Sequence, residues 1–420
     1  MSAPEVITFG CRLNAFESEV IRGHAEKAGH RDMIIVNTCA VTAEAVRQAR
    51  QAIRRAHREN PTKKIIVTGC AAQINPKEFA GIPGVAKVIG NDEKMKFETY
   101  QSLESREKIL VNDIMSVKET AGHLIEGFEG KSRAFVQVQN GCDHRCTFCI
   151  IPYGRGNSRS VGIGEVISQI KLLVRRGYKE VVLTGVDITS YGPDLPGEPK
   201  LGDLVQQILG KIPELKRLRL SSLDAVEVDE ALYEAIIGDA RVMPHLHLSL
   251  QAGDNMIRKR MKRRHTREDA IEFTNRVRSR RPEVVFGADF IAGFPTESED
   301  MFQKTLDLVE ECGLNFLHVF PYSVRKGTPA ANMPQVPGNV RKERAARLRE
   351  KGQEADLRLF EKLVGEVATV LVERNDSSRE VSLGHAEDFS PVIVEGIYDA
   401  GTMVPVNLEK VSDGNLWGRP

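Results

Sequence analysis

Short apolar runs alternate with longer helix-like stretches along most of the chain, and this alternation restricts the possible folds more than any other feature. In the first hundred residues, strands are expected over residues 5–9, 33–36, 64–67 and 85–89, and helices over 16–28 and 43–59. Apolar strands that alternate with helices are typical of a parallel sheet. The sequence therefore predicts an α/β protein whose first domain, residues 1–97, is a Rossmann-like parallel sheet.

A second alternation begins at Ala134, after a polar segment, residues 98–130, that is expected to be a linker. Its six expected strands cover residues 134–139, 180–184, 217–220, 245–250, 284–290 and 316–320. Six successive strand–helix units fit a partial (β/α)6 barrel better than two unrelated sheets. We therefore expect a central barrel over residues 131–356, and an open doubly wound sheet is the alternative.

The pattern changes again after a charged helix that is expected over residues 340–363. Five short strands separated by Gly, Asn and Asp turns are then expected over residues 367–372, 381–383, 392–394, 403–408 and 416–417. Short strands of this kind predict a small β-barrel, a module that often binds RNA. Residues 357–420 are therefore expected to form a third domain, which agrees with a length of 420 residues.

Composition restricts the class of protein less than the pattern does. Lys and Arg number 59 against 58 for Asp and Glu, a balance that neither requires nor excludes a nucleic-acid partner. No apolar run reaches the roughly 18 residues of a membrane span, and the first residues do not resemble a signal peptide. We therefore expect a cytoplasmic protein without a membrane partner. Its seven cysteines are an odd number in a chain too long to need disulfides, so their positions matter.

The strongest motif is a C-x3-C-x2-C spacing formed by Cys142, Cys146 and Cys149, directly after an expected strand. Three thiolates can hold a [4Fe-4S] cluster and leave one iron open, whereas electron-transfer clusters normally have four cysteine ligands. An open iron can chelate S-adenosylmethionine (SAM), and reduction then releases a deoxyadenosyl radical. The alternative is a zinc site with His144 as fourth ligand. Zinc ligands usually come in two separate pairs, and no second pair is present, so we favour the cluster.

Three further cysteines, Cys11, Cys39 and Cys70, each follow an expected strand of the first domain, at separations of 28 and 31 residues. Parallel strands end at the same edge of a sheet, which is where α/β proteins bind ligands. These thiols are therefore expected to gather and hold a second cluster. The alternative is three unrelated buried cysteines. Cys312 has no cysteine nearby and is expected in the core.

Weaker candidates lie at the ends of later strands. Polar residues that could contact SAM, or that merely line the barrel, are Gly185, Asp187, Ser249 and Gln251. Residues 258–265 hold six cations and no acid, which is compatible with a solvated helix face or with phosphate contacts to RNA.

The residues around both cysteine sets resemble the radical-SAM methylthiotransferase family, and the likeness covers nearly the whole chain. It includes residues 142–156, 183–192, 245–251, 289–297 and 322–328, and a C-terminal module similar to the family's TRAM domain. Residues 11–18, 37–42 and 143–145 resemble the branch that acts on N6-threonylcarbamoyladenosine in tRNA. One departure is that the stretch between Cys11 and Cys39 is short for the family, as if a strand or loop before Met33 were absent.

The resemblance implies two [4Fe-4S] clusters with different tasks. Cys142, Cys146 and Cys149 would hold the cluster that cleaves SAM, with Phe148 against its adenine, and the other three cysteines an auxiliary cluster that carries the sulfur. Two molecules of SAM would be used per turnover, one to methylate that sulfur and one to yield the radical that removes hydrogen from C2 of the adenosine 3′ of the anticodon. The implied partners are tRNA and an electron donor such as flavodoxin or ferredoxin.

Two alternative functions are also compatible with the sequence. The first keeps the chemistry but acts on isopentenyladenosine in tRNA or on a ribosomal protein. The second, of another class, is an iron–sulfur RNA-binding sensor without catalysis, which the open-iron motif disfavours.

Overall fold

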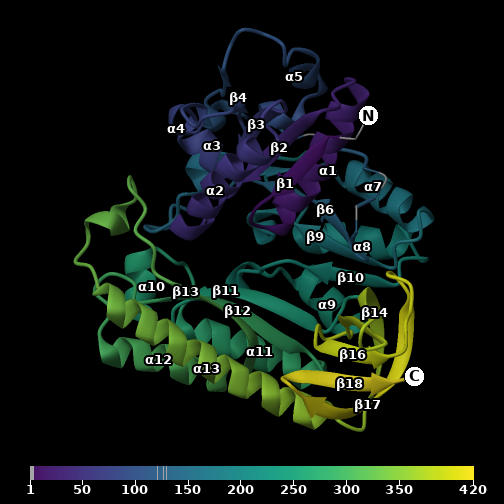
Figure 1. The fold of residues 1–420 in the computed structure, drawn as a ribbon. Helices are drawn as coiled ribbons and strands as arrows, with labels where there is room; N and C mark the ends of the chain where they lie inside the picture. The colour runs from purple at the N-terminus through teal and green to yellow at the C-terminus, as the bar shows by residue number, and fades with distance from the viewer. Residues whose placement is uncertain (1–3, 121, 126, 129) are drawn as a thin grey trace.

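The computed structural model describes residues 4–420 except 121, 126 and 129, and it has three parts (Figure 1). The N-terminal sheet, purple to blue in the figure, lies above the central strands, and the C-terminal strands, in yellow, lie beside the central ones. The α/β class and the three architectures predicted from the sequence are confirmed.

The N-terminal domain contains a parallel sheet in the order β1-β2-β3-β4-β5, formed by Glu5–Thr8, Met33–Thr38, Lys64–Gly69, Val85–Ile89 and Ile109–Leu110. Its helices are α1 (Arg12–Lys27), α2 (Ala43–Glu59), α3 (Cys70–Ile74), α4 (Pro76–Ala80) and α5 (Phe97–Gln101). The side chains of β2 are buried on both faces, as a sheet covered on both sides requires. Strand β5 has only two residues and lies within the segment that was expected to be a linker.

The crossover connections of this sheet have an unusual handedness. Strands β1, β2 and β3 follow one another across the sheet, yet α1 packs on one face and α2 on the other. Two crossovers that step in the same direction but lie on opposite faces have opposite hands, so one of them has the rare left hand. Residues 28–32 form the whole connection from α1 to β2, in agreement with the shortness noted before Met33.

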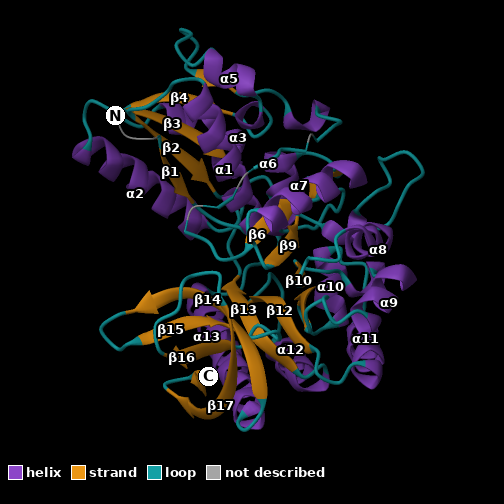
Figure 2. Ribbon diagram, turned by 90° about the vertical axis from the view of Figure 1, so that its right-hand side faces the viewer, coloured by secondary structure: helices purple, strands orange, loops and turns teal. Residues whose placement is uncertain are grey.

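The central domain is a partial barrel of parallel strands. Two three-stranded sheets, β6-β9-β10 (Ala134–Gln137, Glu180–Thr184, Arg217–Leu220) and β11-β12-β13 (His245–Gln251, Val285–Ala292, Leu314–Pro321), are joined by parallel bridges at Leu218–Val242 and Leu223–Leu248. The longer helices are α7 (Ile163–Arg175), α8 (Leu201–Lys211), α9 (Glu230–Gly238), α10 (Asn255–Met261), α11 (Arg267–Arg280), α12 (Glu299–Glu311) and α13 (Gly338–Leu363). Helices α8, α9 and α11 lie outside the strands in Figure 2. The strands run in sequential order, as in a barrel rather than a doubly wound sheet.

Shorter elements complete the central domain. They are β7 (Gln139–Asn140), which pairs with β8 (Arg159–Ser160), and the one-turn helix α6 (Ile151–Arg155). Single 3-10 turns cover Ile188–Ser190, Ala225–Glu227 and Pro329–Asn332 in this domain, and Glu93–Met95 and Ile114–Ser116 before it.

The C-terminal domain is a closed barrel in the order β14-β15-β16-β18-β17, formed by Val367–Asp376, Val381–His385, Pro391–Glu395, Asn415–Arg419 and Met403–Ser412. It docks on the central strands through arginines of β10 and the residue before β6. Arg219 donates to the carbonyls of Ala386 and Glu387, each at 2.9 Å, and Arg133 forms an ion pair with Glu373. The interface combines these polar contacts with apolar packing of Phe316 and Phe360 against the core of the C-terminal barrel.

Among the described residues, no helix is both long and apolar enough to span a bilayer.

The Glu180 carboxylate is the buried charge on which this interface depends. Its side chain is fully buried and lies 2.8 Å from Arg219 Nε, 3.2 Å from Arg133 Nε and 3.7 Å from Arg217 Nη1. Substitution Glu180→Gln leaves three guanidinium groups without this carboxylate, and we expect the free energy of unfolding to fall by about 3–5 kcal/mol. Urea unfolding followed by circular dichroism measures it. Glu214→Gln, at an exposed position, is the control and should change the value by less than about 0.5 kcal/mol; equal effects of the two variants would contradict the prediction.

Candidate active site

The C-x3-C-x2-C triad lies on the loop between β7 and α6. The loop turns at Gly141, where φ is +73° and a Cβ atom would lie 1.8 Å from the Asn157 carbonyl oxygen, so only glycine fits. The amide of Cys142 donates to the Gly156 carbonyl, and that of Cys149 to the Cys146 carbonyl, both at 3.1 Å. Burial raises the pKa of the Cys149 thiol to about 12, and Cys146 adds to the increase. A bound cation would favour the thiolate form of Cys149.

The second triad lies at the carboxyl edge of the N-terminal sheet, as parallel strands predict. Cys11 is the residue before α1, Cys39 follows β2, and Cys70 begins α3 directly after β3. Burial raises the pKa of the Cys39 thiol to about 11, and Cys70 and Cys11 both raise it further. A Cβ atom on Gly10 would lie 2.8 Å from Cys39 Sγ. The structure thus brings the three thiols together at one edge.

The two triads border the same region of the molecule. Helix α6, which follows the first triad, packs against α3, which begins at Cys70. Asn91 bridges the two, because its Nδ2 donates to the Gly154 carbonyl at 2.5 Å and lies 3.7 Å from Cys70 Sγ. Cys70 also raises the pKa of Cys149. Residues of both domains therefore enclose one site.

A cavity of about 240 Å³ lies at this junction. It is lined by Val41 and Thr42, which follow Cys39, by Phe148–Ile151, by Gln251, Asp289 and Ile291 of the barrel, and by residues 320–323 and Arg325. Phe148 and Gln251, both predicted to contact SAM, thus face the cavity. Arg325 faces it too, and its Nε and Nη2 atoms are buried without a hydrogen-bond partner among the described residues.

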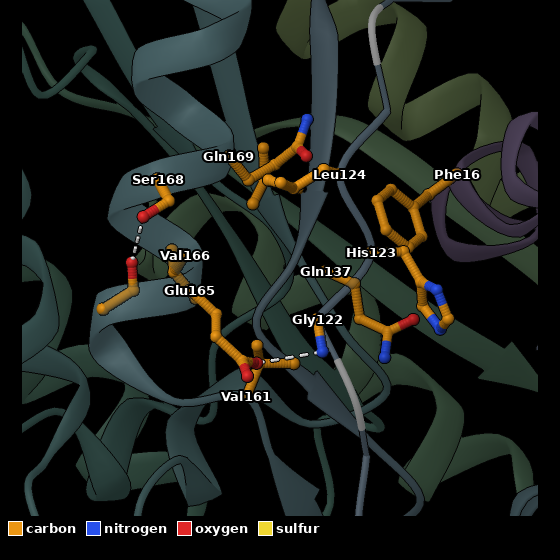
Figure 3. A pocket seen from close by; sticks show the side chains of 12 residues that line it. Phe16, Gly122, His123, Leu124, Gln137, Val161, Glu165, Val166, Ser168 and Gln169 are labelled. Carbon is orange, nitrogen blue, oxygen red and sulfur yellow. Dashed lines mark hydrogen bonds between the residues drawn. The ribbon is translucent and has the colours of Figure 1, made fainter.

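A larger cavity, of about 470 Å³, is lined by Phe16, by residues 122–124, and by β6 and α7 (Figure 3). In it Glu165 accepts a hydrogen bond from the Gly122 amide at 2.9 Å, and Ser168 donates to the Gly164 carbonyl at 2.8 Å. None of the described residues that line this cavity is a cysteine, so the smaller one is the better candidate for the site.

The other residues predicted to contact SAM do not line the smaller cavity, although Asp187 Oδ2 lies 3.9 Å from Cys142 Sγ. The amides of Val186 and Asp187 donate to Gln139 Oε1 at 3.0 and 2.9 Å, which holds the loop of Gly185 against the strand that precedes Cys142. The Ser249 carbonyl accepts from Arg263 at 2.9 Å. Gly185, Asp187 and Ser249 are therefore not among the described residues that line the smaller cavity.

His144 does not have the character of a zinc ligand. Its Nε2 lies 3.0 Å from Asp187 Oδ2 and 3.4 Å from Glu227 Oε1. Hydrogen bonds to Asp187 and Glu227 raise the pKa of His144 to about 10, and its Nε2 atom is thus engaged by two carboxylates. The geometry favours the cluster interpretation of the first triad over the zinc alternative.

A buried ionic network joins the domains beside both triads. Arg155, in α6, contacts Glu17 of α1 at 2.7 and 3.0 Å, and Lys94 contacts the same carboxylate at 2.6 Å. Arg155 also donates to Asn14 at 2.6 Å and to Asn140 at 3.0 Å. Burial alone would lower the pKa of Arg155, but Cys70 and Glu17 raise it well above its usual value. One carboxylate thus faces two cations, and the excess positive charge lies next to the thiols.

The basic run at residues 258–265 divides into two groups. Arg258 is buried and donates to the Ala252 and Thr266 carbonyls, while Arg263 pairs with Asp224 at 2.7 Å and lies 3.9 Å from Cys146 Sγ. Lys259, Lys262 and Arg264 are exposed. As a whole the run is therefore neither a solvated face nor a phosphate-binding patch.

Four charged residues of the site were not predicted from the sequence: Arg155, Glu17, Lys94 and Arg325. Arg155 lies six residues after Cys149, within the segment 142–156 that resembles the methylthiotransferase family, and Arg325 lies within the similar segment 322–328. The sequence signal that could have indicated Arg155 and Arg325 as site residues was a basic residue within a family-like segment.

Comparison with known proteins agrees with this geometry. Residues 136–309 match the radical SAM superfamily, and residues 4–90 match the family described as uncharacterized protein family UPF0004. The threonylcarbamoyladenosine tRNA methylthiotransferase MtaB of Rickettsia prowazekii is 54% identical over 98% of this chain and 96% of its own. The chain belongs to the radical SAM methylthiotransferase family.

Other family members are more distant. MtaB of Aquifex aeolicus is 37% identical over 95% of this chain and 98% of its own length. The tRNA-2-methylthio-N(6)-dimethylallyladenosine synthase of Carboxydothermus hydrogenoformans is 33% identical over 98% and 97%. The solved structure of the radical SAM methyltransferase TsrM from Kitasatospora setae, with cobalamin and a [4Fe-4S] cluster bound, has a TM-score of 0.58 at 14% identity and covers 79% of this chain and 77% of its own. At that identity the likeness concerns the fold alone.

Glu17→Gln tests the buried network of this methylthiotransferase. The variant keeps the shape of the side chain but leaves Lys94 and Arg155 buried without a carboxylate, and we expect unfolding in urea to need about 3–5 kcal/mol less free energy. Glu26→Gln, an exposed position on the same helix, is the matched control. If the two variants were equally stable, the network would not hold the domains together.

The difference in stability between wild type and Glu17→Gln should depend on pH. Burial raises the pKa of Glu17, but Arg155 and Lys94 outweigh it and bring the pKa to about 2, below the ordinary 4.5. A carboxyl group with a lowered pKa stabilises the fold above its unfolded pKa, and this contribution is lost as the pH falls towards the folded pKa. The difference between wild type and Glu17→Gln, measured on metal-free protein, should be constant from pH 6 to 8 and shrink below about pH 4.5. A difference that vanished already at pH 6 would contradict this.

Proposed function

We propose that this chain converts N6-threonylcarbamoyladenosine, next to the tRNA anticodon, into its 2-methylthio derivative by radical SAM chemistry. The observation that carries the proposal is that two triads of cysteines from two domains border one region, whose cavity is lined by Cys149 of the first triad and by Val41 and Thr42, which follow Cys39 of the second. The first triad would be the catalytic one, and each would hold a [4Fe-4S] cluster. SAM would be used twice per turnover, once as methyl donor and once as the source of the radical.

The residues present suit two such groups. Each triad offers three thiols, and a cubane with three thiolate ligands keeps one open iron and a net negative charge in its common oxidised state. The excess cation of the Arg155, Lys94 and Glu17 network lies beside Cys70, and Arg263 lies 3.9 Å from Cys146. When bound, the cluster of the first triad supplies an iron for SAM and the electron that cleaves it, and that of the second an iron for the sulfur.

The surrounding side chains position the reactants and exclude water. Asn91 and α6 hold the two triads at a fixed separation, and buried cations stabilise the thiolate forms of the cysteines. Phe148, which packs edge-on against Phe294 at 6.3 Å between ring centroids, offers a flat apolar wall for an adenine. Gln251, at the end of β11, would also contact SAM. An enclosed site with an apolar wall also limits side reactions of a carbon radical.

The tRNA is the partner that the family supports. Relatives named for threonylcarbamoyladenosine reach 54% and 37% identity, against 33% for one named for dimethylallyladenosine, which favours the threonylcarbamoyl substrate. The closed C-terminal barrel supplies a module typical of RNA binding. Within the run at residues 258–265, the exposed Lys259 and Lys262 could still contact phosphates, whereas Arg264 pairs with Glu227. The reaction also needs an electron donor such as flavodoxin or ferredoxin, and the cytoplasm is where it would meet tRNA.

Alanine variants of the two triads separate the proposed tasks. Cys142→Ala with Cys146→Ala and Cys149→Ala should abolish release of 5′-deoxyadenosine from SAM. Cys11→Ala with Cys39→Ala and Cys70→Ala should retain that release but abolish methylthio transfer, with about half of the iron lost. Both are measured by mass spectrometry after anaerobic reconstitution with SAM, dithionite and tRNA.

Two outcomes would overturn the proposal. No 5′-deoxyadenosine from the wild-type protein would support an iron–sulfur sensor, and methylthio transfer to isopentenyladenosine tRNA or to a ribosomal protein, but not to threonylcarbamoyl tRNA, would move the substrate to that branch. Cys312→Ala is the control for loss of a buried thiol outside both triads.

A further inference from the structure

Arg12 occupies a position that is electrostatically unfavourable for a cation. It follows Cys11 and is the first residue of α1, whose first turn, described throughout, contains no acidic side chain. The amino end of a helix carries partial positive charge, which favours anions and disfavours cations there. A positive side chain at this point is therefore not explained by the stability of the helix.

The guanidinium of the partly buried Arg12 side chain reaches towards the barrel. It lies 6.0 Å from the centroid of the Phe389 ring, and the same ring has Arg133 at 5.0 Å and Arg219 at 5.1 Å. Phe389 also stacks on His245 of β11, at 5.1 Å between centroids. Arg12 thus lies among residues of the barrel interior and of the C-terminal domain, close to other cations.

The nearby carboxylates are already engaged. Arg133, Arg217 and Arg219 share Glu180, and they receive two further carboxylates from Glu373 and Glu387. Asp289, which lines the smaller cavity, accepts hydrogen bonds from His247 at 3.0 Å and His318 at 3.1 Å. Within the described part of the chain, no carboxylate forms an ion pair or hydrogen bond with Arg12. An anion from outside the chain would satisfy it.

The cysteines raise the pKa of other arginines of the site, whereas no cysteine is among the main influences on Arg12. Burial lowers the pKa values of Arg155 and Arg325, and it is opposed by Cys70 at Arg155 and by Cys39 at Arg325. Burial also lowers the pKa of Arg12, and Arg133 and Arg219 lower it further, against smaller effects of Glu180 and Asp289. All four of these charged groups belong to the central domain.

We propose that Arg12 binds the carboxylate of the threonylcarbamoyl group and so positions the substrate base. This inference rests on the proposed function. Threonine linked to the adenosine through its amine keeps a free carboxylate, which is ionised at neutral pH, and a guanidinium pairs with a carboxylate through two parallel hydrogen bonds. An isopentenyl group has no charge, so the same contact would discriminate between the two modified adenosines. Because Arg12 directly follows Cys11, the bound side chain would anchor the base beside the second triad.

The test compares two substrates and three variants of the reconstituted full-length enzyme. The substrates are an anticodon stem-loop RNA that carries N6-threonylcarbamoyladenosine and the same RNA with the side-chain carboxylate converted to a primary amide. The variants are Arg12→Gln, Arg12→Lys, and Arg31→Gln as the control, an exposed arginine of the same domain. The readouts are kcat and KM for methylthio product, iron content, and 5′-deoxyadenosine released without RNA.

Loss of a charged hydrogen-bonded pair corresponds to about a tenfold to hundredfold loss in kcat/KM, expressed mainly in KM. Arg12→Gln should show this loss on the acid but little further loss on the amide, Arg12→Lys should recover part of it, and Arg31→Gln should match wild type. Iron content and RNA-independent SAM cleavage should stay within twofold of wild type.

The opposite results overturn the inference. Wild-type enzyme that uses amide and acid equally well would exclude recognition of the carboxylate, even if Arg12→Gln failed to fold. Equal losses of Arg12→Gln on both substrates, or a parallel loss of RNA-independent SAM cleavage, would assign Arg12 to the fold or to SAM instead. Wild-type enzyme without product on the acid substrate would refute the proposed function itself, and the inference with it.

Discussion

The contact between Arg155 and Glu17 is the interaction on which the rest of the site depends. In the proposed reaction neither triad would be complete as a reaction centre alone, because the group that activates SAM and the group that carries sulfur would belong to different domains. Arg155 follows the first triad in the chain, and Glu17 lies on the helix that begins after Cys11. A fully buried ion pair with several hydrogen bonds tolerates little displacement, since separation would leave charges without partners. The pair thus fixes the two triads relative to each other, as the proposed reaction on a single substrate would require.

The same network bears on the two buried thiols of the second triad, Cys39 and Cys70. Three thiolates without a counter-charge would be costly, and burial keeps the thiols protonated, as the raised pKa values of Cys39 and Cys149 indicate. Two cations against one carboxylate supply a surplus of positive charge next to Cys70. This surplus suits a negatively charged cluster better than it suits the free thiols. Metal loading and domain docking are therefore expected to stabilise each other.

Sequence patterns predicted the positions of the cysteines well and the contacts between domains poorly. Strand ends in a parallel sheet must share an edge, so the spacing of Cys11, Cys39 and Cys70 along the chain was enough to place them together. The partner of Arg155 could not be predicted, because Glu17 is 138 residues away and nothing local links the two. The basic run at residues 258–265 shows the same limit. Charge alone does not distinguish Arg258, which donates to buried carbonyls, from the exposed Lys259 beside it.

The C-terminal barrel is linked to the reaction site through the interior of the central domain rather than through its surface. Phe389 contacts arginines of the central strands, and those arginines surround the Glu180 carboxylate. Arg12, beside the second triad, approaches the same aromatic ring from the N-terminal domain. All three domains therefore meet around one cluster of charges and rings. If the C-terminal barrel binds the tRNA, this shared cluster of charges and rings sets the position of the bound RNA relative to both triads. A substitution within the cluster would then change the position of the substrate without altering a cysteine.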